Sequence, residues 1–138
     1  MSHEKFETVR SYLAALNARD IEGLLACCTD DVVLVPVTVA MEGEYTGRSG
    51  IERFFADLRD TAPDMEVEAE RLETVGKSVL AFERGTASGR ASEVSADIDF
   101  TTVYEFQGRK ISRVLVFVSR QAALEAVGLS DHDAHADS

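Results

Sequence analysis

The 138-residue sequence contains no tryptophan and only two cysteines, two prolines and three histidines. Cys27 and Cys28 are adjacent, so they cannot build an ordinary disulfide framework, and no second pair completes a zinc site. We expect reduced thiols in the core, because no cationic setting that would support a redox role is visible. His3, His132 and His135 all lie near the ends of the chain, which argues against a Ser-His-acid triad and a His-based metal centre.

Basic charge and long apolar runs are also scarce. The 14 Lys and Arg residues against 25 Asp and Glu residues give a formal net charge of -11, which repels phosphate backbones and anionic membrane surfaces. No apolar run approaches the roughly 20 residues that cross a bilayer, and no secretory signal pattern is visible. The sequence therefore predicts a cytoplasmic protein with no nucleic-acid and no membrane partner.

What the sequence does contain is typical of one globular domain. Hydrophobic residues make up 45% and charged residues 28% of the chain, and its length suits a single core. We expect one domain over residues 1–130 and a polar, disordered tail over residues 131–138. Glycine-rich phosphate loops are absent from the sequence, so we expect no nucleotide cofactor, and we assign no metal ligands.

Three helices are predicted in the first half of the chain. Apolar residues at helical spacing predict a first helix from Glu4 to about Ala18, and Asp20 is positioned as the N-cap of a short second helix. Ser49 and Glu52 form a capping box that predicts the start of a third helix. This helix should end before Pro63.

Strand patterns dominate the rest. Residues 32–39 are rich in Val and contain Pro36, which favours an edge or bulged strand. From Met65 onward apolar and polar residues alternate, and glycines then divide the chain into runs near residues 78–87, 93–106 and 110–120. Successive hairpins predict an antiparallel meander, followed by one helical turn over residues 121–127 closed by Gly128.

Four motifs in this order resemble a known family. The motifs are YLAALNARDIEGLL at 12–25 with TDDV at 29–32, YTGRSGI at 45–51 with Phe54 and Phe55, FQGRKI at 106–111, and ALEAVGL at 123–129. Together they resemble the SnoaL-like and ketosteroid-isomerase-like branch of the nuclear transport factor 2-like superfamily. The resemblance implies an α+β, cystatin-like fold in which a cone-shaped, curved antiparallel sheet wraps around three N-terminal helices.

The same resemblance implies an incomplete catalytic set. Ketosteroid isomerases use an Asp base together with an oxyanion hole of Tyr and a protonated Asp. Here Tyr12 falls at the position of the tyrosine, whereas Pro36 and Thr102 fall at the positions of the base and the neutral acid. Proline cannot move a proton, so steroid isomerisation from the usual positions is excluded. A limonene-epoxide-hydrolase constellation is disfavoured as well, because residues 111–119 contain no carboxylate.

Side-chain alternation predicts which sheet residues face the cavity. On the 93–106 run, Asp97 and Asp99 lie on the face opposite to Thr102 and Tyr104, so either becomes a candidate base only if a β-bulge turns it inward. The same alternation predicts that even-numbered residues of the preceding run, among them Leu80 and Thr86, line the cavity. The full predicted ligand-binding set is Tyr12, Leu16, Phe54, Phe55, Leu58, Phe82, Arg84, Thr102, Tyr104, Val116 and Val118.

Some of these residues have two readings. Tyr12 is a candidate hydrogen-bond donor to a ligand or a packed core tyrosine. Arg84 either holds an anionic or carbonyl ligand or forms an ion pair with a Glu of the neighbouring strand.

Two functions fit these predictions. The first is binding of a small, largely apolar molecule, with isomerase-, cyclase- or lyase-type chemistry on a carbonyl compound. The second is a non-catalytic ligand carrier or a dimeric scaffold, and the sequence leaves open whether the chain is an enzyme. An open cavity holding a buried carboxylate favours the first function, and a cone filled by side chains favours the second. Either way we expect a homodimer that pairs through the outer sheet face, because Leu115 and Phe117 would otherwise be exposed there.

Overall fold

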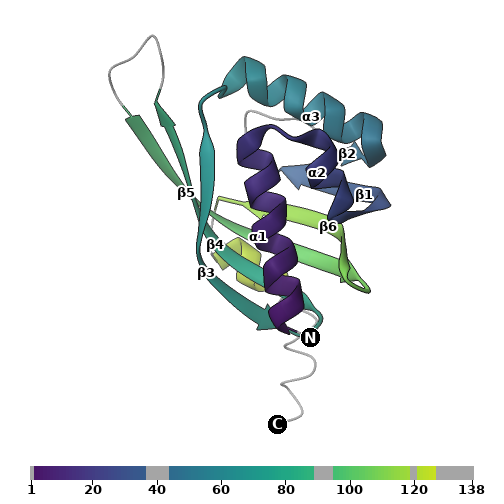
Figure 1. The fold of residues 1–138 in the computed structure, drawn as a ribbon. Helices are drawn as coiled ribbons and strands as arrows, with labels where there is room; N and C mark the ends of the chain where they lie inside the picture. Colours follow the sequence, from purple (N-terminus) through teal and green to yellow (C-terminus); the bar gives the residue numbers. More distant parts are fainter. Residues whose placement is uncertain (1, 37–43, 89–94, 119–120, 127–138) are drawn as a thin grey trace.

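The computed structural model describes residues 2–36, 44–88, 95–118 and 121–126. Three helices come early in the chain: α1 (Ser2–Ala18), α2 (Ile21–Ala26) and α3 (Gly47–Thr61). The strands are β1 (Cys28–Pro36), β2 (Tyr45–Thr46), β3 (Glu66–Val75), β4 (Ser78–Ser88), β5 (Ser95–Gln107) and β6 (Lys110–Phe117) (Figure 1). Among the residues described, no helix is long and apolar enough to span a membrane.

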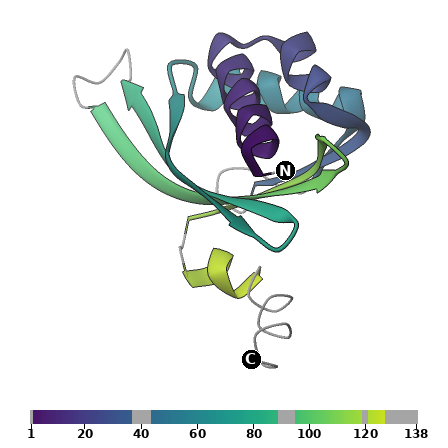
Figure 2. The same ribbon diagram turned by 60° about the horizontal axis from the view of Figure 1, so that its bottom comes forward.

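The six strands form one sheet in the order β2-β1-β6-β5-β4-β3. β3 to β6 make the predicted antiparallel meander. β1 departs from the prediction, since it pairs in parallel with β6 and makes the sheet mixed rather than purely antiparallel. The sheet curves around α1, with all three helices on its inner side, while residues 121–126 lie against its outer side (Figure 2). The predicted α+β fold is therefore confirmed.

The helix boundaries test the capping predictions. The Asp20 carboxylate accepts a hydrogen bond from the Gly23 amide, so the predicted N-cap of α2 is confirmed. The predicted capping box at Ser49 is wrong, because α3 begins at Gly47 and Ser49 lies inside its first turn. Thr46 occupies the N-cap position without a side-chain hydrogen bond. The end of α3 at Thr61 agrees with the prediction.

β1 is irregular. It begins at Cys28, four residues before the predicted start, and its register with β6 shifts between Cys28 and Val33. Pro36 lies at the last position of the strand, where a missing amide donor costs little. The rest of the predicted run, residues 37–39, lies outside the described residues.

Apolar side chains gather on both faces of the sheet. The main core lies between the helices and the inner face. A smaller cluster on the outer face joins Leu80 and Val103 to Ala123 of the helical segment 121–126, with Leu115 and Phe117 packed at its edge. Leu115 and Phe117 are therefore half-buried within the single chain rather than fully exposed. Val127 and Gly128, predicted to close this segment, lie outside the described residues.

Candidate functional site

A cavity of about 420 Å³ lies between the helices and the inner face of the sheet. Its size is in the range of small-molecule sites. Ile98 and Val118 stand at its rim, where they remain 45% and 56% exposed. Its lining comes from α1, β1, α3, β3, β4, β5, β6 and their flanks: Tyr12, Leu13, Leu16, Leu34, Pro36, Phe54, Leu58, Thr61, Ala62, Met65, Val67, Glu83, Ile98, Phe100, Thr102, Tyr104, Val114, Val116 and Val118. Beside the packed core, the interior between the helices and the sheet thus keeps an open cavity that side chains do not fill.

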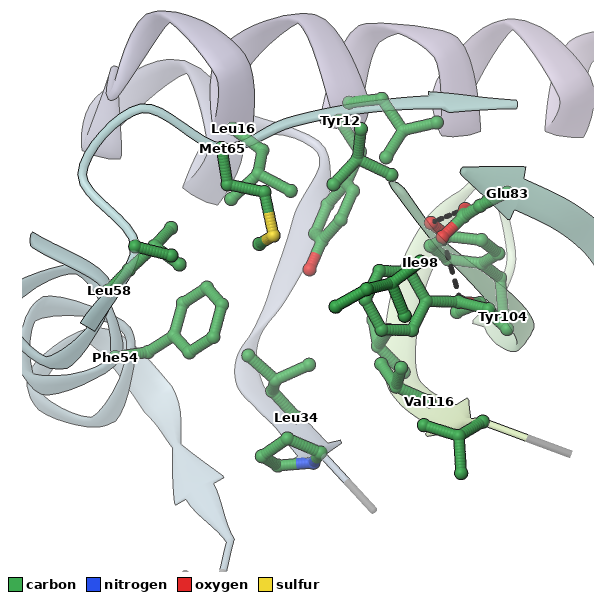
Figure 3. A pocket seen from close by; sticks show the side chains of 18 of the residues that line it. Tyr12, Leu16, Leu34, Phe54, Leu58, Met65, Glu83, Ile98, Tyr104 and Val116 are labelled. Carbon is green, nitrogen blue, oxygen red and sulfur yellow. Dashed lines mark hydrogen bonds between the residues drawn. The ribbon is translucent and has the colours of Figure 1, made fainter. Parts of the chain in front are cut away.

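One carboxyl group, that of Glu83, lies in the wall of this cavity. Glu83 extends from β4, and Thr102 and Tyr104 extend from the adjacent strand β5. The Thr102 hydroxyl donates a hydrogen bond of 2.8 Å to Glu83 Oε1. The Tyr104 hydroxyl donates one of 2.5 Å to Glu83 Oε2, so both carboxyl oxygens are held in place (Figure 3).

The surroundings of Glu83 change its protonation. The residue is only 5% exposed, and burial raises the pKa of its carboxyl from 4.5 to about 7. The hydrogen bonds from Tyr104 and Thr102 act in the opposite direction, because they stabilise the charged form, but burial outweighs them. At neutral pH both the acid and the carboxylate are therefore populated, which is the property required of a group that takes up and returns protons.

Tyr12 supplies a second polar group. It lies on α1, is 3% exposed, and its ring packs edge-on against that of Tyr104 with centroids 5.5 Å apart. Figure 3 shows its hydroxyl pointing into the cavity. Burial raises the pKa of Tyr12 well above 10, and the nearby Cys28 and Glu83 raise it further. Tyr12 therefore stays a neutral phenol that can donate a hydrogen bond to a ligand oxygen.

The opposite end of the cavity is apolar. Phe54 and Leu58 of α3 face Glu83 and Tyr104 across the cavity, with Met65 beside them (Figure 3). Gly85 keeps room at the sheet wall for the Phe100 ring, since a Cβ there would lie 2.7 Å from its Cε2 atom. A ligand that fills this space would have one polar end and a larger apolar body.

Two residues singled out by the resemblance also line the cavity. Pro36 reaches it from the end of β1, and Thr102 reaches it from β5, where it binds Glu83. The carboxyl group that Pro36 cannot provide is thus present on another strand. Sequence reasoning missed Glu83 because it assigned the wrong face to β4.

The prediction that Leu80, Phe82, Arg84 and Thr86 line the cavity is wrong. In the antiparallel pair β4–β5, opposed residues share a face, and the register sets odd-numbered residues of β4 opposite even-numbered residues of β5, as in Val79 with Tyr104, and even-numbered residues of β4 opposite odd-numbered ones, as in Leu80 with Val103. The inward face of β4 therefore carries the odd-numbered residues. Leu80 and Phe82 belong to the outer cluster, and Arg84 is exposed beside Glu70 at 3.5 Å and Asp99 at 3.2 Å.

Three further predicted site residues lie outside the cavity. Asp97 and Asp99 are exposed, because β5 keeps an unbroken register with β4 from Ser95 to Tyr104 and no bulge turns them inward. Phe55 is buried in the main core, where its ring packs edge-on against that of Phe54, and it is not part of the cavity wall. The remaining predicted ligand-binding residues all line the cavity: Tyr12, Leu16, Phe54, Leu58, Thr102, Tyr104, Val116 and Val118.

The two thiols lie near this site. Burial raises the pKa of Cys28 to about 12, and it raises the pKa of Cys27 as well. Both thiols therefore stay protonated at neutral pH and are poor nucleophiles. Within the described ranges, no cluster of three or more His, Cys, Asp or Glu residues is arranged to hold a metal ion.

Comparison with known proteins shows which family and which solved structures this chain resembles. A family model described as SnoaL-like domain matches residues 9–114. TerC, co-crystallized with polyporic acid, is 22% identical with a TM-score of 0.76, over 90% of this chain and 98% of TerC. An uncharacterized cystatin fold protein from Novosphingobium aromaticivorans is 27% identical with a TM-score of 0.67, over 82% of this chain and 97% of that one. SalBIII, an epoxide hydrolase/cyclase-like enzyme with a role in pyran ring formation in the polyether salinomycin, is 20% identical with a TM-score of 0.70, over 87% and 94%. No curated protein matches the sequence.

Proposed function

Because the chain belongs to the SnoaL-like domain family, as its motifs predicted, we propose that it binds a small, largely apolar molecule and moves a proton on it with Glu83. The reaction class is an isomerase-, cyclase- or lyase-type conversion of a carbonyl compound. The observation that carries the proposal is a buried carboxyl, with a pKa of about 7, in the wall of a largely apolar cavity.

In this mechanism the carboxylate form of Glu83 removes a proton from the carbon next to the carbonyl group. Negative charge then develops on the carbonyl oxygen, and the neutral Tyr12 hydroxyl donates a hydrogen bond to it. The protonated Glu83 returns the proton to another atom of the same molecule. Thr102 and Tyr104 act as positioning residues, since each holds one oxygen of Glu83.

The same group suits a cyclisation. A ring closes when a hydroxyl group of the substrate adds to a carbon–carbon double bond conjugated to its carbonyl group. The Glu83 carboxylate accepts the hydroxyl proton as the C–O bond forms and the double bond opens, and the protonated Glu83 then returns that proton to the carbon next to the carbonyl. The role of SalBIII in pyran ring formation supports this reaction class as part of the proposal. The apolar end around Phe54 and Leu58 would hold the hydrocarbon part of such a substrate in the folded form that closes the ring.

The experiment uses a probe that reports on a buried base without knowledge of the natural substrate. Nitrobenzisoxazole is small and apolar; removal of its ring C–H proton by a base breaks its N–O bond and gives a coloured phenolate. We expect turnover whose rate rises with pH through about 7, as Glu83 ionises. Glu83→Gln should lower kcat/KM by roughly 100-fold or more.

Glu66→Gln is the matched control. Glu66 is an exposed residue at the start of β3, so this variant removes the same charge without touching the cavity. It should keep the wild-type rate. Turnover that survives Glu83→Gln would refute the proposed base, and binding of the probe without Glu83-dependent turnover would support the non-catalytic carrier instead.

The proposal includes a cytoplasmic homodimer that pairs through the outer face of the sheet. The half-buried Phe82, Leu115 and Phe117 around the outer cluster support this surface as the contact. Equilibrium sedimentation at micromolar concentration should give twice the mass of the chain. A monomer under these conditions would contradict the homodimer.

A further inference from the structure

The donors and acceptors at the polar end of the cavity are unequal in number. Thr102 and Tyr104 both donate their hydroxyl hydrogens to Glu83. A carboxylate has about four acceptor positions, so the Glu83 carboxylate keeps acceptor capacity after these two bonds. A ligand head group that brings hydrogen-bond donors therefore finds partners here, whereas one that brings only acceptors finds mainly the Tyr12 hydroxyl.

The charge at this end is also one-sided. Among the described lining residues, Glu83 is the only one that carries a charge at neutral pH, and none is Lys, Arg or His. The nearest charged neighbour along β4, Arg84, points away to the outer face and is paired with Glu70 and Asp99. A bound anion would therefore face a buried carboxylate without a compensating cation from these residues.

Aromatic rings line the cavity as well. Tyr12 and Tyr104 lie on the side of Glu83, Phe54 lies across the cavity from them, and Phe100 also lines the wall (Figure 3). The faces of such rings attract organic cations and repel anions because of their quadrupole. The aromatic rings and the Glu83 carboxylate thus both favour a positively charged ligand.

We propose that the cavity selects ligands by charge: small, largely apolar protonated amines bind with the ammonium group against Glu83, and carboxylates or phosphates of the same size are rejected. The inference rests on the proposed ligand site and narrows the class of molecules that it accepts. The substrate carries no anionic group, and lipophilic amines compete with it for the cavity.

A matched series of probes tests this selection. Three naphthalene derivatives of similar size carry an ethylamine, an ethanol or an acetate side chain, and their affinities are measured by titration calorimetry at about pH 8, where Glu83 is ionised. The amine should bind about tenfold more tightly than the alcohol. The acetate should bind at least about tenfold more weakly than the alcohol.

Two variants separate Glu83 from the overall negative charge of the protein. Glu83→Gln should bring the affinity of the amine to within about threefold of the alcohol and leave the alcohol nearly unchanged. Glu66→Gln removes an equal charge from the surface and should keep the full preference for the amine. An acetate that binds as tightly as the amine, or a preference that survives Glu83→Gln, would overturn the inference.

The pH dependence gives a second, independent measurement. The ammonium pairs with the carboxylate form of Glu83, so amine affinity should fall about fivefold, toward that of the alcohol, between about pH 7.5 and about pH 5.5, while alcohol affinity changes little. An amine affinity that does not change over this range would contradict the pairing. These outcomes are separable from catalysis: a Glu83-dependent preference without probe turnover supports the inference and removes the proposed reaction, and turnover without the preference does the reverse.

Discussion

Glu83 and Arg84 are adjacent charged residues on β4, yet they have opposite surroundings. The Glu83 carboxyl is buried in the cavity wall, where burial raises its pKa to about 7. The Arg84 guanidinium is exposed on the outer face, where Asp99 and Glu70 raise its pKa. The pleat of the strand sends the two side chains to opposite faces of the sheet, so one residue acquires the properties of an acid–base group and the other forms surface ion pairs.

The difference extends to the packing around each residue. The inner face encloses a cavity of about 420 Å³, whereas residues 121–126 cover part of the outer face and close the cluster of Leu80, Val103 and Ala123. Hollow space on one face leaves room for a ligand, and close packing on the other stabilises the sheet that holds Glu83 in position. Substitutions on the two faces should therefore have different consequences.

The largest effect is expected from Leu80→Ala on the outer face. Leu80 is 1% exposed and packs against Val103 and Ala123, so its truncation leaves a void in a closed cluster. We expect a loss of about 2–5 kcal/mol in the free energy of unfolding, measured by urea denaturation. Val116→Ala on the inner face should cost less, because Val116 is half-buried and already borders open space. Equal losses would show that the two faces are packed alike.

The next effect is the pH dependence of stability in Glu83→Gln. The pKa of Glu83 is about 7 in the folded chain against 4.5 for the free group, so the native state binds the proton more tightly. Raising the pH from about 4.5 to about 7 therefore removes stability that Glu83 contributes in its protonated form, and above that range the buried carboxylate destabilises the fold. The Gln side chain does not titrate, so the variant does not lose this stability. The free energy of unfolding of Glu83→Gln, relative to that of the wild type, should therefore rise by on the order of 3 kcal/mol across this range.

Denaturation of both proteins at a series of pH values gives this difference directly. Parallel pH profiles for wild type and Glu83→Gln would mean that Glu83 titrates normally and would remove the contrast with Arg84. Glu66→Gln provides the reference for an exposed carboxylate, because Glu66 lies outside the cavity.

Much of this architecture was predictable because it depends on local patterns. Helical spacing, the Asp20 cap and the glycine-bounded strand runs are features of neighbouring residues, and they predicted α1, α2 and the meander correctly. The parallel pairing of β1 with β6 joins segments more than 70 residues apart, as in Val33 opposite Arg113, and no local pattern encodes it.

The site residues were predicted correctly only on the elements whose inward face was assigned correctly. Tyr12, Thr102 and Tyr104 line the cavity as expected. Glu83 was missed because facing on β4 depends on its register with β5, and a register that pairs odd with even positions inverts the assignment made by simple alternation. One signal was available: on β4, Glu83 interrupts an apolar set that includes Val79 and Ala81, and a single carboxylate on such a face is typical of a buried functional group.

A smaller effect is expected from Tyr104→Phe, which removes the hydroxyl that donates to Glu83 Oε2 at 2.5 Å. This hydrogen bond lowers the pKa of Glu83, so its loss should raise that pKa further and move the pH profile of probe turnover to higher pH. The stability loss should be about 1–3 kcal/mol above the pKa, where the carboxylate is charged, and smaller near about pH 5. Rates of probe turnover over a pH series check the shifted profile, and denaturation curves over the same series check the loss of stability. An unshifted profile would mean that Tyr104 does not act through Glu83.

The smallest effect is expected from Arg84→Ala, although Arg84 is next to Glu83 in the sequence. Its ion pairs with Glu70 and Asp99 are solvent-exposed, and exposed pairs contribute little because water and salt screen them. We expect no resolvable shift in the unfolding midpoint, and no change in amine affinity or probe turnover, since the side chain points away from the cavity. Calorimetric titration with the naphthyl amine alongside Glu83→Gln makes the comparison direct. If Arg84→Ala alters binding as strongly as Glu83→Gln, the guanidinium contributes to the cavity after all and β4 does not separate two functional faces.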